Sequence, residues 1–195
     1  ATVPVPDAPS NLQVSLLLSL QTRLTWTDNA TTETGFVIER SDNGDPFVVI
    51  ASPAANTTLY TDSTVVPGHT YTYQVAAVNG SGRSGVATAG SVYIPTAPAA
   101  PSNFAATAQV TTVSTARINL SWVDNSNDET SFVIQRATDA GFTTNLATFT
   151  RRANATTLVQ TGLPRGVTYY YRILAQNAYG QSAWVNLSPP SITTP

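Results

Sequence analysis

Short segments in which apolar and polar residues alternate run along almost the whole chain. The sharpest of them occupy residues 71–77 and 169–175. The side chains that would share one face are Tyr71, Tyr73, Val75 and Ala77 in the first segment and Tyr169, Tyr171, Ile173 and Ala175 in the second. A period of two places such side chains on one side of a strand. Similar segments recur at intervals of roughly 8 to 12 residues between Gly, Pro, Asn and Asp, which indicates antiparallel strands joined by turns. We therefore expect an all-β chain.

The pattern is written twice. Residues 25–44 read TWTDNATTETGFVIERSDNG, and residues 121–141 read SWVDNSNDETSFVIQRATDAG. The proline-rich segment IPTAPAAPSN lies between the copies, and proline disfavours regular strand pairing and stiffens a connection. A length of 195 residues suits two small domains, so we expect domains at residues 1–95 and 96–195. The first and last residues resemble this linker, which suggests a piece of a longer array.

The Trp and Phe of each copy are predicted core residues. Trp26 and Trp122 alternate with other apolar residues of their segments, as do Phe36 and Phe132. A buried Trp removes on the order of 200 Å² from water, which makes it a large contributor to the core of a small domain. We expect each copy to pack around its own indole.

Composition excludes several classes of partner and chemistry. The chain has nine basic residues, all of them Arg, and a net charge of -2, so we expect no nucleic-acid partner. It has no apolar run near the roughly 20 residues that span a bilayer, so we expect no membrane insertion. There is no Cys, so neither a disulfide nor a thiolate metal site can form within the chain.

Catalytic residues are scarce as well. His69 is the only His, and VPGHTY places it in a turn, where we expect it to be exposed. Without Lys, Cys or a second His, the common nucleophile and base pairs reduce to Ser or Thr with carboxylates, which no motif positions. Glu33 and Glu129 fall in separate copies, so a paired-carboxylate site would have to span the linker. We expect no enzyme activity and no cofactor.

The acidic loop Asp124–Thr130, DNSNDET, has oxygen-bearing side chains at alternate positions, like the first half of a calcium loop. It lacks the mid-loop Gly and the distal Glu of such sites, and the first copy has Thr32 in place of Asp128. We favour a structural turn in which Asp side chains accept hydrogen bonds from nearby backbone N–H groups. Calcium binding at Asp124–Glu129 stays open as the alternative.

A candidate binding face lies in the second copy. Tyr170 and Arg172 alternate with the predicted core positions, Trp184 stands where the first copy has Val86, and Tyr179 lies in the preceding turn. Aromatic rings with an Arg could stack on a sugar or contact a partner protein. The alternative is that Trp184 covers its own sheet or the linker.

Six Asn-x-Ser/Thr triplets fit a secreted protein. A chain rich in Ser and Thr produces them by chance, so they are weak evidence for glycosylation. They begin at Asn29, Asn56, Asn79, Asn119, Asn154 and Asn186.

Both copies resemble fibronectin type III modules over essentially the whole chain. The segments VVPGHTYTYQVAAVNGSG and LPRGVTYYYRILAQNAYG are similar to the family's Leu-x-Pro-Gly-x-x-Tyr-x-Tyr segment, although Arg165 separates Pro from Gly in the second. The resemblance implies two seven-stranded antiparallel immunoglobulin-like sandwiches in tandem. It also implies that the hydroxyls of Tyr71 and Tyr169 bond back to the backbone of the preceding loop.

The same resemblance sets the functional expectation. The W-x-D-N phrase followed by E-T-x-F-V-I-x-R resembles microbial members, so we expect a bacterial secreted or cell-surface protein. We expect a non-catalytic spacer and a scaffold for protein interaction or adhesion, with neighbouring domains of a larger protein as partners. Alternatives are a polysaccharide- or surface-protein-binding module that uses the Trp184 face, and a subunit that pairs edge strands with other chains.

Overall fold

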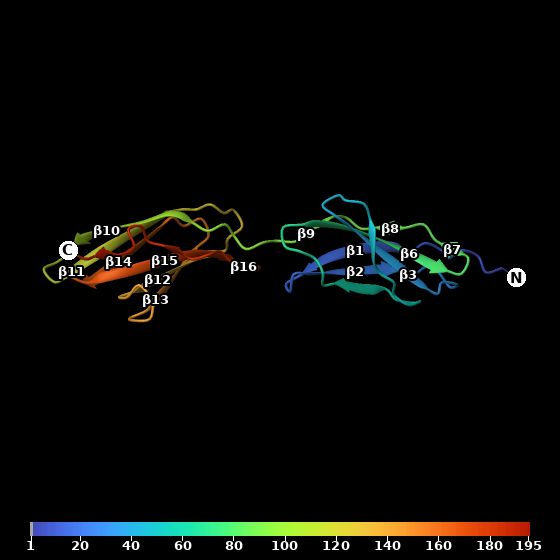
Figure 1. The fold of residues 1–195 in the computed structure, drawn as a ribbon, viewed down its shortest axis with the longest axis horizontal. Coiled ribbons are helices and arrows are strands. Elements are labelled where there is room, and N and C mark those ends of the chain that lie inside the picture. The colour runs from blue at the N-terminus through green and yellow to red at the C-terminus, as the bar shows by residue number, and fades with distance from the viewer. Residues whose placement is uncertain (1) are drawn as a thin grey trace. The chain divides into compact units, whose positions relative to one another are not determined.

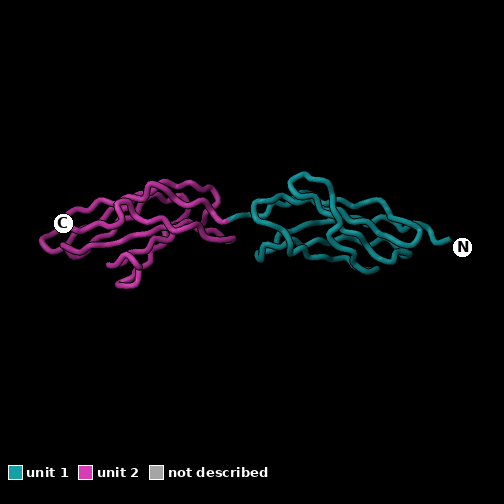
Figure 2. The backbone as a smooth tube through the Cα atoms, viewed as in Figure 1, with its two compact units in different colours: residues 1–96 teal, residues 97–195 magenta. Residues whose placement is uncertain are grey.

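The computed structural model describes residues 2–195, and all regular elements in that range are β-strands (Figure 1). The chain divides into two compact units, residues 1–96 and 97–195 (Figure 2). The boundary between the units follows Thr96, one residue beyond the boundary after Pro95 that the sequence predicted. Each unit is described by itself below.

The first unit contains two antiparallel sheets. One sheet has the order β1-β2-β5, and the other has the order β4-β3-β6-β7, with β8 and β9 also paired to β6. The strands are β1 (Ser10–Leu17), β2 (Gln21–Thr27), β3 (Gly35–Asp42), β4 (Val48–Ala51), β5 (Leu59–Asp62), β6 (Thr70–Asn79), β7 (Gly82–Arg83), β8 (Ala87–Thr88) and β9 (Val92–Tyr93).

The second unit repeats this topology. Its sheets have the orders β10-β11-β14 and β13-β12-β15-β16, with β17 and β18 also paired to β15. The strands are β10 (Ser102–Val110), β11 (Thr115–Val123), β12 (Ser131–Ala137), β13 (Ala147–Arg152), β14 (Thr157–Pro164), β15 (Thr168–Asn177), β16 (Gly180–Gln181), β17 (Val185–Asn186) and β18 (Ile192–Thr193).

Each unit has seven strand positions, because its last three short strands pair in succession with one long strand and together form one broken edge strand. The alternation seen in the sequence is the burial pattern of these strands. In β6 and β15 the first residues alternate between half-buried and buried. The predicted fold class, two antiparallel sandwiches in tandem, is confirmed.

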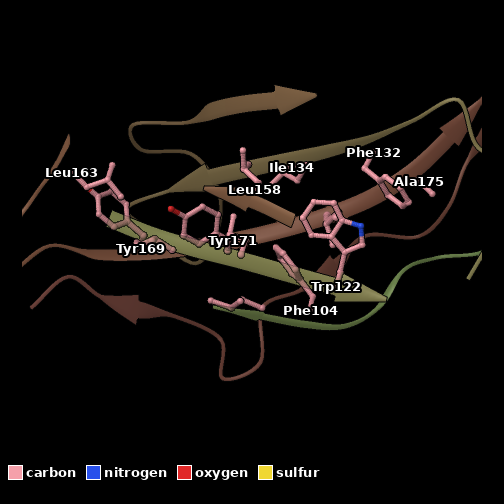
Figure 3. Close-up of a cluster of buried hydrophobic side chains, with 13 residues drawn as sticks. Phe104, Trp122, Phe132, Ile134, Leu158, Leu163, Tyr169, Tyr171 and Ala175 are labelled. Carbon is pink, nitrogen blue, oxygen red and sulfur yellow. The ribbon is translucent and has the colours of Figure 1, made fainter. Parts of the chain in front are cut away.

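The core of each unit contains its own Trp, as predicted. Trp26 lies edge-on to Phe36 with ring centroids 5.5 Å apart, and Trp122 lies at the same distance from Phe132. Figure 3 shows Trp122 with Phe132 at one end of the second cluster and Tyr169 at the other. Each buried cluster consists only of residues from its own unit.

The corner tyrosines differ between the units. The Tyr71 hydroxyl accepts a hydrogen bond from the Val66 N–H at 3.0 Å, as the resemblance implied. For Tyr169 that expectation is wrong, because its hydroxyl has no such bond among the contacts of residues 2–195. Pro164 occupies the place of Val66, and proline has no N–H to donate.

A buried ion pair lies beside the tyrosines of the first unit. Arg40 donates through Nη1 to Asp62 Oδ2 at 2.7 Å, and the Asp62 side chain is 1% exposed. Tyr73 donates to the same oxygen, and the Thr64 N–H and hydroxyl donate to Oδ1. Burial alone would raise the pKa of Asp62, but the hydrogen bonds from Thr64 and Arg40 outweigh it and lower that pKa.

The second unit has the same arrangement without the acid. Arg136 donates to Gln160 Oε1 at 2.8 Å, and Tyr171 donates to the same oxygen at 2.9 Å. The strand neighbour of Gln160 is Ile118, whereas Asp62 in the first unit is opposite Thr22. A neutral amide thus replaces a carboxylate at one buried position of an otherwise repeated fold.

Candidate functional site

The acidic loop of each unit closes on itself. Asp124 accepts a hydrogen bond from the Ser126 N–H, and Asp28 accepts one from the Ala30 N–H. The Asp128 carboxylate accepts from the Ser126 hydroxyl at 2.6 Å. These are the local bonds of the structural-turn interpretation. Among residues 2–195, no group of three or more His, Cys, Asp or Glu is arranged to hold a metal ion.

Glu33 and Glu129 serve the same structural purpose in both units. The Asn56 N–H donates to Glu33 at 3.3 Å, and the Asn154 N–H donates to Glu129 at 2.8 Å. Asn56 and Asn154 have positive φ angles of 62° and 61°, a conformation that Asn tolerates better than most residues. Both carboxylates therefore stabilise a turn in their own unit.

His69 makes more contacts than we expected of an exposed turn residue. Its Nδ1 lies 2.8 Å from Asp42 Oδ1, and its ring stacks on Tyr71 at 6.0 Å. The two side chains of the His69–Asp42 pair are 38% and 35% exposed, so the pair is half-buried. Sequence alone missed Asp42 because the two residues come from different strand ends.

The aromatic face of the second unit is built around Arg172. The guanidinium carbon lies 4.4 Å from the centroid of the Trp184 ring and 4.3 Å from that of Phe142. Arg172 Nε donates to Gln135 Oε1 at 2.7 Å. Trp184 is 37% exposed, so its ring covers Arg172 of its own sheet and still presents surface to solvent. The structure brings Arg172 and Trp184 together and adds Phe142, which sequence analysis missed.

Phe142 reaches Arg172 from the loop between β12 and β13 because Asp139 holds that loop. The Asp139 carboxylate accepts hydrogen bonds from the N–H groups of Gly141, Thr143 and Thr144 and from the Thr143 hydroxyl. The hydrogen bond from Thr144 is the first cause of the lowered pKa of Asp139. Phe142 has φ of 57°, a conformation that is strained for a bulky residue.

A small hollow adjoins the Arg172 stack. It has a volume of about 80 Å³. Its lining residues are Ala140, Phe142, Tyr170, Tyr171, Asn186 and Pro190. Phe142 lines the hollow together with Tyr170 and also contacts Arg172. The predicted site residue Tyr170 therefore lies beside the Arg172 stack. We call Gln135, Phe142, Tyr170, Arg172, Trp184 and Asn186 the Arg172 face.

Tyr179, the fourth predicted site residue, lies elsewhere. It is in the turn after β15, where its N–H donates to Asn177 Oδ1. A strand rises about 3.3 Å per residue, so the far end of β15 is roughly 20 Å from Tyr170. Of the four residues chosen from the sequence, the structure groups three.

At the place that corresponds to the Arg172 face, the first unit has an ion pair between two of its own side chains. Arg83 donates to both oxygens of Glu39, at 2.7 and 2.5 Å, and Gln74 donates to Glu39 Oε2 at 2.6 Å. The hydrogen bond from Arg83 is the first cause of the lowered pKa of Glu39. Gln74 and Arg172 hold the same position in β6 and β15 relative to Tyr71 and Tyr169.

The exposed edge strands also differ. β4 carries no charged residue, and it exposes Val48 and Val49 by 57% and 58%. The matching edge strand β13 ends in Arg151 and Arg152, which are both exposed. Charged side chains on an edge oppose pairing with another chain, so only β13 is protected in this way.

The part of the chain that the structure describes, residues 2–195, contains no helix with the length and apolarity needed to cross a membrane.

We compared the chain with known protein families and solved structures. The family model described as fibronectin type III domain matches residues 7–90. The chain is similar in structure to the FN1–FN3 domains of chicken CNTN1, with 16% identity, 97% of this chain and 66% of that chain covered, and a TM-score of 0.48. It is also similar to a two-domain fibronectin type III segment of chicken tenascin, with 16% identity, 96% and 100% of the chains covered, and a TM-score of 0.44.

Proposed function

We propose that this chain is a non-catalytic, extracellular pair of fibronectin type III-like modules that spaces and presents neighbouring domains of a larger bacterial secreted or cell-surface protein. The observation that carries the proposal is the separation of the cores. Each unit buries a complete apolar cluster of its own, so neither depends on the other for its fold. Self-sufficient modules joined by a short connection suit a spacer.

The connection supports the same proposal. Pro95, Pro98 and Pro101 lie within seven residues at the junction of the two units. Proline fixes φ and favours extended backbone, so a proline-rich connection acts as a semi-rigid spacer where a Gly/Ser segment would act as a flexible coil. The proposed mechanism is therefore control of distance.

Distance measurements between spin labels test this mechanism. The chain has no Cys, so Ser52→Cys and Asn127→Cys at exposed positions give one label in each unit. We expect a narrow distance distribution. A variant with Gly-Ser-Gly-Ser inserted between Thr96 and Ala97 should broaden it. A native distribution as broad as that of the insertion variant would contradict the spacer function.

A second candidate function is ligand binding at the Arg172 face. The observation that favours it is Trp184, a large aromatic side chain that is 37% exposed on a sheet and stacked on Arg172. Trp, Tyr and Arg are the residue types enriched at binding hot spots. A glycan array and a pull-down with the native chain and Trp184→Ala would test it, and equal signals from both proteins would contradict it.

A further inference from the structure

Arg172 carries a charge that the second unit does not neutralise. Its Nε is bound by the neutral side chain of Gln135, and no acidic partner or hydrogen bond of Nη1 or Nη2 occurs within the described residues 2–195. A guanidinium has five N–H donors in a planar fork that matches a carboxylate. The outer donors of this fork are available to a ligand.

The neighbouring side chains restrict the orientation of the Arg172 guanidinium. Gln135 and Asn186 are its cross-strand neighbours on either side, so three polar side chains form a row across β12, β15 and β17. Phe142 and Trp184 cover Arg172 at 4.3 and 4.4 Å. Aromatic contacts of this kind reduce the rotamer freedom that Arg would lose on binding.

The first unit shows what a closed version of this place looks like. There Arg83, Glu39 and Gln74 satisfy one another, and the acid of the pair comes from the chain itself. In the second unit Gln135 takes the place of Glu39, which removes the internal acid. Gln181 likewise takes the place of Arg83, so Arg172 is the charged residue of this place in the second unit. Because Gln135 has replaced Glu39, a carboxylate that pairs with Arg172 would be supplied by a ligand.

The hollow next to Arg172 narrows the choice of ligand. At about 80 Å³ it holds a small group, and three of its lining residues are Phe142, Tyr170 and Pro190. Such walls favour an aliphatic group over the hydroxyls of a sugar, because buried hydroxyls need hydrogen-bond partners. A carboxylate and a small aliphatic group placed side by side fit the two parts of the face.

Phe142 supports a binding role independently. Asp139 fixes the loop by accepting hydrogen bonds from four donors and holds Phe142 at positive φ. Strained backbone that is maintained by a dedicated set of hydrogen bonds points to a functional position. None of the salt bridges among the described residues joins Asp139 to Arg172.

We propose that the Arg172 face binds an acidic segment of a partner protein. A Glu or Asp carboxylate of the partner accepts hydrogen bonds from Arg172 Nη1 and Nη2, and a neighbouring Val-sized side chain enters the hollow. The inference rests on the candidate binding function of this face and is independent of the spacer function.

The test is an NMR titration of the 195-residue chain with three matched peptides, observed at the indole N–H of Trp184. The probes are acetyl-Gly-Glu-Val-Gly-amide, its Gln-for-Glu analogue and its Gly-for-Val analogue. We expect the first peptide to shift the Trp184 signal and each analogue to bind about tenfold more weakly, because a charge-assisted bidentate contact or a filled hollow is lost. Equal binding of the Glu and Gln peptides would overturn the proposal.

Two variants separate the site from general electrostatics. Arg172→Gln should abolish the shift, whereas Arg117→Gln, an exposed change on the other sheet of the same unit, removes the same charge and should leave binding unchanged. The Trp122 indole signal reports that each variant is folded. Equal loss in both variants would overturn the proposal.

Glucuronate and glucose complete the set of probes. Binding of glucuronate to Arg172 without binding of the Glu peptide would overturn the protein partner and leave the candidate binding function in place. Absence of any shift at Trp184 with all probes would overturn the inferred ligand class, and the spacer function would still stand on the spin-label distances.

Discussion

The two units share one fold and differ in the partners of their Arg side chains. The first unit pairs its buried Arg40 with a carboxylate and closes its surface Arg83 on Glu39. The second unit gives Arg136 a neutral amide and gives Arg172 no acid among the described residues. The apolar cores are nearly equivalent, so the fold does not require either ion pair.

This difference shows which positions of the sandwich are set by packing and which are free to vary. Trp26 and Trp122 fill equivalent places because removing such a ring would leave a large cavity. Asp62 and Gln160 can differ because either one accepts hydrogen bonds from the neighbouring Arg and Tyr. What the buried position needs is an acceptor, and its charge is secondary.

The largest expected effects test whether the cores are independent. We expect Trp26→Ala to lower the free energy of unfolding of the first unit, and Trp122→Ala that of the second, by about 3 to 5 kcal/mol each. Calorimetry should show one transition moving while the other stays. Leu18→Ala, at a position 81% exposed, is the control. Joint melting of both units in either Trp variant would contradict independent cores.

The next effect concerns the buried acceptors. Asp62→Ala leaves the Arg40 charge buried without its acid, which should cost the first unit about 3 kcal/mol. Gln160→Ala removes only a neutral acceptor and should cost the second unit about 1 to 2 kcal/mol. Urea unfolding of each variant measures both values. A larger loss from Gln160→Ala than from Asp62→Ala would reverse the comparison.

Low pH should destabilise the first unit more than the second. The folded-state pKa of Asp62 is below its usual value, so its stabilising contribution is fully present above that usual value, near pH 4, and is lost as the pH falls through the lowered pKa. Glu39 adds a contribution of the same sign. We expect the first transition in calorimetry to fall more steeply than the second below about pH 4.

The control for the acid experiment is Asp62→Asn, which makes the buried acceptor neutral as in the second unit. It should reduce the difference in acid sensitivity, although the exposed Asp139, whose pKa is also lowered, leaves the second unit some sensitivity. Equal slopes for the two native units would argue against the assignment to Asp62.

The smallest expected effect tests the corner tyrosines. Tyr71→Phe removes the acceptor of the Val66 N–H and should cost about 1 kcal/mol. Tyr169→Phe should cost less, because Pro164 offers no N–H to its hydroxyl. Thermal unfolding of the two variants gives the comparison. A cost for Tyr169→Phe as large as that for Tyr71→Phe would show that its hydroxyl has a partner of comparable strength.

The sequence predicted the parts of the structure that depend on local periodicity. The strands around Tyr71 and Tyr169 follow from period-two alternation, and the core role of Trp26 and Trp122 follows from their place in such strands. Duplication strengthened both predictions, because a pattern that appears twice in register is rarely accidental.

The remaining features depend on contacts between residues far apart in the sequence. Asp62 reads as a turn residue in YTDST, and only the pairing of β2 with β5 brings it into the core. Phe142 reads as a loop residue, and only the hydrogen bonds to Asp139 aim it at Arg172. Proximity in the sequence groups Tyr179 with the site, but the length of β15 separates it in the structure.

The placement of the three indoles gives the chain built-in optical reporters. Trp26 and Trp122 are 5% and 4% exposed in separate cores, whereas Trp184 is 37% exposed beside a guanidinium. A buried indole emits at shorter wavelength than a hydrated one, so in the native chain the emission at shorter wavelength reports the two cores and that at longer wavelength reports the Arg172 face. No extrinsic dye is needed to follow each event.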